Sequence, residues 1–373
     1  MKQAALQRSE YIISMLRSLY DSFGYRHYKM NKFEEYDLYS KNKDFIIGDS
    51  IITFTDTNGK LMALKPDVTL SIVKNTRDVP GSVQKLYYNE NVYRVSKSSH
   101  TYKEIMQVGL ECIGDIDSYC IYEVLRLALR SMQYIPANSI FAVSDIGILS
   151  QVIDAIGIPA DEKSLVFRLI GEKNLHELAQ KCADIGIEPE KFAVLRELAA
   201  LRGSAENVLP KMDKLLDGYV DKEAFERFAS KMYALSADES GKQVCIDFSV
   251  VDDIHYYNGI VFKGFIEGVP SSVLSGGQYD KLMKKMKRTS GAIGFAVYLD
   301  ILEQYSYTPV EYDTDFVLLY DNTSTLDAIG NAAEWLSEGG RRILVCKNKP
   351  DGIRYRKLIR IKDNEVEEIE EDA

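Results

Sequence analysis

Histidine and cysteine are rare in this chain, and their spacing fits neither a zinc site nor a disulfide scaffold. The histidines show no HExxH or related pattern, and the cysteines include no CxxC pair. We therefore expect no structural zinc site and no disulfide scaffold, but reduced thiols in the core. The histidines are His27, His100, His176 and His255, and the cysteines are Cys112, Cys120, Cys182, Cys245 and Cys346.

Long apolar runs are also missing. No run reaches the ~20 residues that cross a bilayer as a helix. The first residues, MKQAALQRSEYIISMLRSLYDSFGY, contain acids and carry apolar residues at helical spacing. This pattern predicts an amphipathic helix rather than a signal peptide, so we expect a cytoplasmic protein without membrane contact.

The chain has fewer basic than acidic residues. The chain has 46 Lys and Arg against 56 Asp and Glu, a net charge of −10. Residues 313–373 hold 9 basic and 14 acidic residues and end in NEVEEIEEDA. Because phosphate binding needs clustered Lys and Arg, a surface for nucleic acid is not expected.

The usual nucleotide and nucleophile motifs are absent as well, namely the P-loop, GxGxxG after a strand and the nucleophile elbow. What is present is an ordered series of helix and strand patterns. Residues 1–146 are mixed, 147–240 have helical periodicity with short breaks, 241–308 return to strand patterns, and 309–373 predict a small α/β domain ending in a hairpin at Asp363-Asn364. One antiparallel sheet split around a helical insertion belongs to the α+β class.

Four strand-like pieces precede the insertion. DSIITFTD (49–56) and LMALKPD (61–67) flank the turn DTNG, which favours a hairpin. VQKLYYNENVYRV (83–95) and EIMQVGLECIG (104–114) alternate polar and apolar residues, as antiparallel neighbours do.

Polar side chains gather on two of these pieces. If residues 65–69 are extended, Asp67 and Thr69 share a face and could clamp an amine, although an ordinary polar strand end has the same pattern. Gln107 and Glu111 share a face opposite an apolar one, and Arg94 could lie on the adjoining strand. A surface acid is the alternative for Glu111.

Two further stretches follow the insertion. HYYNGIVFKGF (255–265) places Tyr256 and Tyr257 on opposite faces if it is a strand, and paired tyrosines often only pack. LSGGQYDKL (274–282) has a Gly pair that permits close backbone approach or a tight turn. GAIGFAVYLDILEQY (291–305) predicts a strand that leads into a helix.

The order of these stretches is informative. LKPDVT, VYR, EIMQVGLE, a helical insertion, HYYNG, SGGQYD and GFA before a helix follow one another. This order resembles the catalytic core of class II histidyl-tRNA synthetases over roughly residues 1–302. The resemblance implies an antiparallel sheet flanked by helices and a homodimer, with the small C-terminal domain where synthetases carry their anticodon-binding domain.

The resemblance also implies an amino-acid pocket that is largely kept. Carboxylates would receive an α-ammonium and an imidazole N–H, and amide and hydroxyl groups would satisfy the rest. Arg94 matches an arginine that faces a phosphate or carboxylate. The implied histidine-binding residues are Asp67, Thr69, Arg94, Gln107, Glu111, Tyr256 and Tyr257.

The positions implied for ATP differ from the family. Ser96 replaces a glutamate, Asp252 or a neighbour replaces the catalytic arginine, and Gln278 and Ile301 replace two more arginines. Lys65 stands where arginine is usual. Because each lost oxyanion-type contact is worth about 3 kcal/mol, together these changes would suppress amino-acid activation by many orders of magnitude.

A synthetase-like fold with a kept histidine pocket and a lost ATP site is similar to the regulatory subunits of ATP phosphoribosyltransferase. That similarity implies a non-catalytic, histidine-sensing chain that activates a short catalytic subunit in a hetero-oligomer, in the first step of histidine biosynthesis. It implies no cofactor, and tRNA as an unlikely ligand. The alternatives are a divergent histidyl-tRNA synthetase with histidine-dependent ATP activation, and another synthetase-like binding or scaffold paralogue.

Overall fold

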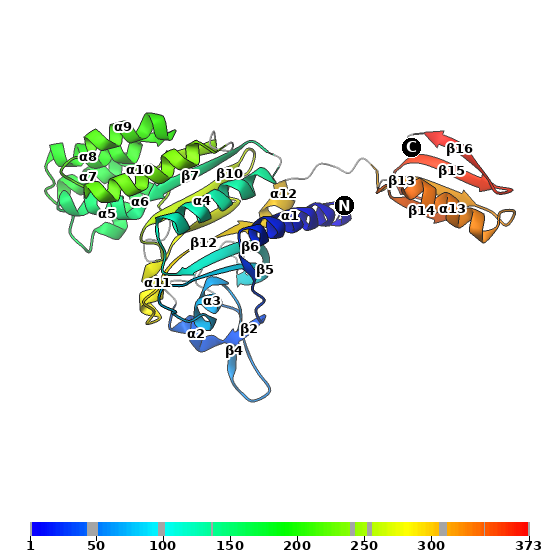
Figure 1. The fold of residues 1–373 in the computed structure, drawn as a ribbon, viewed down its shortest axis with the longest axis horizontal. Helices are drawn as coiled ribbons and strands as arrows, with labels where there is room; N and C mark the ends of the chain where they lie inside the picture. Colours follow the sequence, from blue (N-terminus) through cyan, green and yellow to red (C-terminus); the bar gives the residue numbers. More distant parts are fainter. Residues whose placement is uncertain are drawn as a thin grey trace. The chain divides into compact units, whose positions relative to one another are not determined.

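The computed structural model describes residues 2–42, 51–95, 101–135, 137–238, 243–251, 256–305, 312–338 and 340–371. The chain divides into two compact units (Figure 1). One comprises residues 9–305, and the other comprises residues 306–373 with residues 1–8. Within the described ranges, no helix is both long and apolar enough to cross a membrane.

A mixed sheet forms the centre of the larger unit. Its strands pair antiparallel except β1 with β5 and β7 with β9, which are parallel. In the described residues the order is β1 (Arg26–His27), β5 (Val83–Val95), β6 (Tyr102–Gly114), β12 (Gly291–Tyr298), β11 (Leu274–Gln278), β10 (Ile260–Ile266), β7 (Ser139–Asp145), β9 (Val244–Asp247) and β8 (Arg202–Gly203).

The longest pairing joins β5 and β6, as their alternating patterns predict. The register runs from Val83 opposite Gly114 to Val95 opposite Tyr102. Since successive side chains of a strand point to opposite faces, β6 presents Val108, Leu110 and Cys112 to one side and Gln107, Gly109 and Glu111 to the other. The apolar side belongs to the main core.

Helices α1 (Lys2–Ser22) and α4 (Ser118–Gln133) cover the apolar face of the sheet. Ile12, Leu16 and Tyr20 recur every four residues along α1 and are buried, as the amphipathic pattern predicts. The Tyr20 hydroxyl lies 2.9 Å from Ser131 Oγ on α4. This contact ties the two helices together beneath the sheet.

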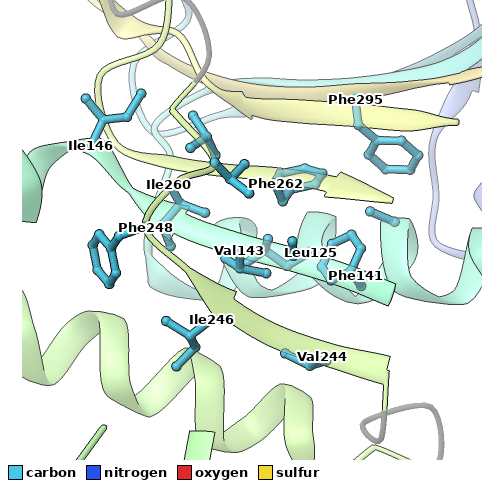
Figure 2. Packing of buried hydrophobic residues seen from close by; sticks show 14 of the residues in the cluster. Leu125, Phe141, Val143, Ile146, Val244, Ile246, Phe248, Ile260, Phe262 and Phe295 are labelled. Atoms are coloured by element: carbon cyan, nitrogen blue, oxygen red, sulfur yellow. The ribbon is translucent and has the colours of Figure 1, made fainter. Parts of the chain in front are cut away.

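Aromatic rings fill the core between α4 and the sheet. Figure 2 shows Leu125 of α4 together with Phe141 and Phe262 of the neighbouring strands β7 and β10. The Phe141 and Phe262 ring centroids lie 5.4 Å apart, and Phe295 of β12 extends the row at 6.2 Å from Phe262. This close packing supports β12 on the face of the sheet that α1 and α4 cover.

The opposite face of the sheet carries a second, smaller core. It packs Tyr88, Val92, Ile113 and Ala292 against short elements on that side. These elements are α2 (Tyr36–Ser40), α3 (Thr69–Asn75), α11 (Asp280–Lys285) and a small sheet of β2 (Phe33–Glu35), β4 (Leu61–Leu64) and β3 (Thr53–Thr55).

The hairpin predicted at DTNG is confirmed. Strands β3 and β4 pair antiparallel, and Asp56 Oδ1 accepts hydrogen bonds of 2.8 Å from the backbone N–H groups of Asn58 and Lys60. Gly59 has a positive φ of 80°. The turn needs this left-handed conformation, which glycine adopts without a steric penalty.

Between β7 and β9 the chain forms α5 (Ile146–Ala155), α6 (Lys163–Gly171), α7 (Leu175–Asp184), α8 (Pro189–Ala200), α9 (Ala205–Leu215) and α10 (Lys222–Ser236). These helices gather at the end of the sheet where β7 lies (Figure 1). The segment also contributes β8, which the helical periodicity did not predict. Arg202 and Gly203 pair with Asp247 and Ile246 of β9, and the Arg202 side chain lies 3.3 Å from the Asp247 carboxylate.

The C-terminal unit contains β13 (Thr314–Tyr320), α13 (Leu326–Ser337), β14 (Ile343–Cys346), β15 (Tyr355–Lys362) and β16 (Glu365–Glu371). Its described strands are ordered β14-β13-β15-β16, and β13 runs parallel to both neighbours. The hairpin predicted at Asp363-Asn364 is confirmed, because both residues have positive φ, 49° and 69°, between β15 and β16. Phe316, Leu318 and Ile329 pack between sheet and helix.

Candidate functional site

A polar cavity lies on the face of the large sheet that also carries α3 and α11. All seven residues predicted to bind histidine line it: Asp67, Thr69, Arg94, Gln107, Glu111, Tyr256 and Tyr257. Strands β5, β6, β11 and β12 form its floor, and the segments around residues 67–69 and 256–257 form its walls.

Glu111 is the central acid of the cavity. Its side chain is buried, and its two oxygens have separate partners. Thr69 Oγ1 donates to Oε1 at 2.7 Å, and the Tyr279 hydroxyl donates to Oε2 at 2.6 Å. Burial raises the pKa of Glu111 to about 8, although both hydrogen bonds oppose the shift. The prediction of Glu111 as a cavity group rather than a surface acid therefore agrees with its position.

Gly294 of β12 makes room for this carboxylate. It is the direct partner of Glu111 in the pairing of β12 with β6. A Cβ atom at position 294 would overlap Glu111 Oε2 and would lie 2.5 Å from the backbone oxygen of Leu110. A glycine is thus required here for close approach, and any side chain would displace the acid.

The segment from Lys65 to Thr69 is not the extended strand that we predicted. Strand β4 ends at Leu64, and α3 begins at Thr69. The Asp67 carboxylate accepts a 2.8 Å hydrogen bond from the backbone N–H of Leu70, in the way that aspartate commonly stabilises a helix start. The start of α3, and not strand alternation, therefore sets the conformation of this segment. Asp67 and Thr69 nevertheless both line the cavity.

Asp67 and Arg94 are adjacent charges in the wall. Burial raises the pKa of Asp67, while the Leu70 hydrogen bond and the positive charge of Arg94 oppose the shift. Arg94 Nε donates to the backbone oxygen of Pro66 at 2.9 Å. The arginine thus holds the turn that carries Asp67 and leaves guanidinium nitrogens for a ligand.

Lys65 lies behind the wall rather than in the cavity. It is 1% exposed and forms an ion pair with Glu90 of β5. Glu90 is the cross-strand partner of Gln107, and its other oxygen accepts from the backbone N–H of Met30 at 3.2 Å. The ion pair therefore supports the turn before Asp67 and the strand beside Gln107.

Tyr256 and Tyr257 do not lie on opposite faces, contrary to the prediction. Strand β10 begins only at Ile260, so strand alternation does not apply to the tyrosines. Their rings meet edge to face with centroids 4.7 Å apart, and Tyr256 lies 5.7 Å from the Tyr279 ring. Both line the cavity, where they form an aromatic wall.

The residues implied to replace ATP contacts have other tasks. Gln278 Oε1 accepts a 3.0 Å hydrogen bond from the backbone N–H of Ile260, and its side chain fills the space beside Gly259. Ile301 of α12 (Leu299–Tyr305) packs against the main hydrophobic core. The predicted differences at Ser96 and Asp252 lie outside the described residues.

The cavity consequently holds more acidic groups than basic ones. Of the described residues that line it, only Arg94 is basic, whereas Asp67 and Glu111 are carboxylic acids. Such a site is suited to a ligand with N–H donors or a positive charge near the acids and a carboxylate near the arginine. In the described part of the chain, no cluster of three or more His, Cys, Asp or Glu side chains could hold a metal ion.

Several cavity residues were not predicted from the sequence. They are Val68, Tyr88, Ser275, Tyr279, Gly294, Phe295, Ala296 and Tyr298. Tyr279 directly follows the SGGQ stretch that was singled out for its glycines, so that motif was the available signal. Tyr88 has no sequence signal of its own, because a tyrosine in a strand usually packs.

Comparisons with known proteins agree with the predicted resemblance. The sequence model of histidyl-tRNA synthetases matches residues 1–302. A protein of Oceanobacillus iheyensis described as an ATP phosphoribosyltransferase regulatory subunit is 22% identical over 340 residues, which cover 90% of this chain and 83% of the relative. A histidine–tRNA ligase of Methanococcus vannielii is 25% identical over 385 residues, with coverage of 97% and 90%.

A solved structure confirms the fold class. The crystal structure of an ATP phosphoribosyltransferase regulatory subunit/histidyl-tRNA synthetase from Bacillus halodurans has a TM-score of 0.75 at 21% identity, and the match covers 95% of this chain and 94% of that one. The sheet, the flanking helices and the small C-terminal domain are common to this fold. With four-fifths of its length matched by the family's sequence model, the chain belongs to the histidyl-tRNA synthetase family.

Proposed function

We propose that the chain is a non-catalytic regulatory subunit of a cytoplasmic ATP phosphoribosyltransferase. It activates a short catalytic subunit and binds L-histidine as an effector in the cavity on β6 and β12. The observation that carries this proposal is the contrast between the two halves of the expected synthetase site. The acids for an amino acid are buried and held in place, whereas Gln278 and Ile301 are engaged in the fold.

Histidine fits the polar groups of the cavity by charge. Asp67 and Glu111 are the two carboxyl groups that the resemblance implies for an α-ammonium and an imidazole N–H, and Asp67 lies in the turn that Arg94 holds. Glu111 is more deeply buried than Asp67 and is oriented by two hydroxyl groups. Hydrogen bonds to both carboxyl groups, charge-assisted at the α-ammonium, would provide most of the affinity.

The lack of positive charge argues against amino-acid activation. Transition states at an α-phosphate need preorganised cations or dipoles, and each such contact is worth about 3 kcal/mol. Among the described lining residues only Arg94 could serve. A site with two buried carboxyl groups and one arginine supplies too little positive charge to stabilise that reaction.

The partner half of the proposal is tested by co-purification. The full-length chain and a short-form ATP phosphoribosyltransferase from the same source are co-expressed, and only one carries a tag. A stable complex and an increase in phosphoribosyltransferase activity on mixing are expected. Separate elution of the two chains together with unchanged activity would contradict the proposal.

The sensor half is tested by calorimetry with L-histidine. Asp67→Asn should weaken binding at least about tenfold, because it removes a buried charge that faces the ligand. Glu104→Gln is the control, since Glu104 is an exposed acid on β6 that does not line the cavity. Absence of heat with millimolar histidine would refute histidine binding by the wild-type chain.

A divergent histidyl-tRNA synthetase is the second candidate. The specific observation in its favour is the match to the Methanococcus vannielii ligase over 97% of this chain. It predicts histidine-dependent exchange of pyrophosphate into ATP. The regulatory-subunit proposal predicts no exchange above background at saturating histidine and ATP, so one assay separates the two candidates.

A further inference from the structure

On the cavity side of β12, the side chains become larger along the strand. Residues at alternate positions face the same side, and here they are Gly294, Ala296 and Tyr298. Gly294 lies opposite Glu111 and leaves it space, while Tyr298 lies opposite Gln107. Strand β12 therefore contributes no side chain at the Glu111 end, where the Glu111 carboxylate takes the space, and a phenol ring at the Gln107 end.

The Tyr298 ring is held in place rather than free to swing out. Its hydroxyl lies 2.7 Å from Ser275 Oγ on the neighbouring strand β11. Its backbone N–H donates to the oxygen of Val273 at 2.9 Å, and Leu299 beyond it is buried in the main core. Because Ser275 is the cross-strand partner of Ala296, the ring reaches from the end of β12 back over the small middle of the floor.

We propose that Tyr298 is a specificity-determining residue that restricts the cavity to a free amino acid. It excludes the same amino acid when a nucleotide is attached to its carboxyl group. The proposal rests on the proposed function, in that histidine is taken as the amino acid. The acids bind the amino acid at one end, and the Tyr298–Ser275 pair fills the volume into which a carboxyl substituent would extend.

Steric exclusion and charge act together here. A substituent that entered beside Gln107 would have to break the Ser275 hydrogen bond and rotate a ring that is flanked by packed strands. It would gain little in return, because Arg94 is the only basic residue among the described residues of the lining. The residue at 298 therefore determines ligand size independently of the acids that bind the amino acid.

The experiment compares two ligands on the full-length chain by calorimetry. L-histidine is the small ligand, and 5′-O-[N-(L-histidyl)sulfamoyl]adenosine, a stable analogue of an aminoacyl-adenylate, is the large one. Wild-type protein should bind the analogue at least about tenfold more weakly than histidine. In Tyr298→Ala the ratio of the two Kd values should fall at least about tenfold, and histidine should compete with the analogue.

Ser275→Ala releases the ring without removing it and should shift the ratio in the same direction by a smaller factor. It is also the second variant should Tyr298→Ala fold poorly. Tyr102→Ala is the matched control, because Tyr102 is 77% exposed at the start of β6, and it should leave the ratio unchanged.

The outcomes separate the two proposals. If the wild-type protein binds histidine but binds the analogue equally well or better, or if both variants keep the wild-type ratio, the role of Tyr298 is refuted while histidine binding stands. If the wild-type protein binds no histidine at millimolar concentration, the sensor half of the proposed function fails, and the restriction to a free amino acid fails with it.

Discussion

Replacing Glu111 by glutamine should make the protein more stable as it removes histidine binding. Glutamine has nearly the same size as glutamate, and its oxygen and NH₂ group can still pair with the hydroxyls of Thr69 and Tyr279. What the variant removes is a titratable group whose pKa burial raises from 4.5 to about 8. The burial cost of that carboxylate is the origin of the effect.

The sign follows from proton binding. The folded protein keeps the proton on Glu111 up to about pH 8, whereas the unfolded chain releases it above about pH 4.5. Wild-type stability therefore falls as pH rises between these values. At about 1.4 kcal/mol per pKa unit, the penalty is on the order of 1 kcal/mol at pH 5.5 and on the order of 3 kcal/mol at pH 7.

The assay is thermal unfolding of wild type and Glu111→Gln at pH 5.5 and pH 7. The stability advantage of the variant should grow by about 2 kcal/mol between the two pH values, or a few degrees in Tm. Any constant difference between the amide and acid hydrogen bonds cancels in this comparison. Parallel pH profiles for the two proteins would refute the reasoning, and Glu104→Gln, on the same strand but exposed, should follow the wild type.

Three further predictions concern contacts of Gly294, Ile301 and Asp78. Gly294→Ala should weaken histidine binding more than about tenfold, because the new Cβ would overlap Glu111 Oε2. Gly330→Ala on α13 is the control, since its Cβ would enter open space and the variant should melt no lower than wild type. A wild-type histidine Kd for Gly294→Ala would contradict this prediction. Ile301→Arg should lower Tm and restore no pyrophosphate exchange, since it places a charge against the core; measurable exchange would be the opposing result. Asp78→Ala should lower Tm by several degrees, because the Asp78 carboxylate accepts hydrogen bonds from three consecutive residues, 288–290. These bonds hold the pKa of Asp78 below its usual range, so the stability that they provide should be lost only in strong acid. An unchanged melting curve at pH 7 would exclude that role.

Much of the fold could be predicted because period and turn chemistry are local. Alternation in β5 and β6 places Gln107 and Glu111 on one face, and the register of the sheet preserves that arrangement. The turns at DTNG and Asp363-Asn364 depend on residues that tolerate positive φ, which the sequence displays directly. These features need no knowledge of distant parts of the chain.

The errors arise where a local rule competes with another. The segment around Asp67 looks like a strand end, but a helix start competes for its carboxylate and wins. Tyr256 and Tyr257 precede β10 instead of lying in it, so two-residue alternation assigns them wrongly. Element boundaries of this kind depend on tertiary hydrogen bonds, such as the one between Ile260 and Gln278, that no short window contains.

The cavity residues that were missed depend on pairing between distant strands. Gly294 is meaningful only because it meets Glu111 across β12 and β6, and Tyr298 only because Ser275 lies on the next strand. The sequence marks these stretches as part of the expected site, but it does not show which residues of other strands lie opposite them. A contact between residues more than 20 positions apart becomes visible only with the sheet order.

The short strand β8 has a consequence for how the inserted helices relate to the rest of the chain. Arg202 and Gly203 pair with Asp247 and Ile246 of β9 and so form the outermost strand at that end of the large sheet, and the Arg202–Asp247 ion pair places charge there. Excision of residues 147–240 would uncover a row of unpaired backbone groups on β9, the kind of edge at which chains aggregate. Removal of the insertion is therefore expected to promote self-association even in a variant whose cavity is intact.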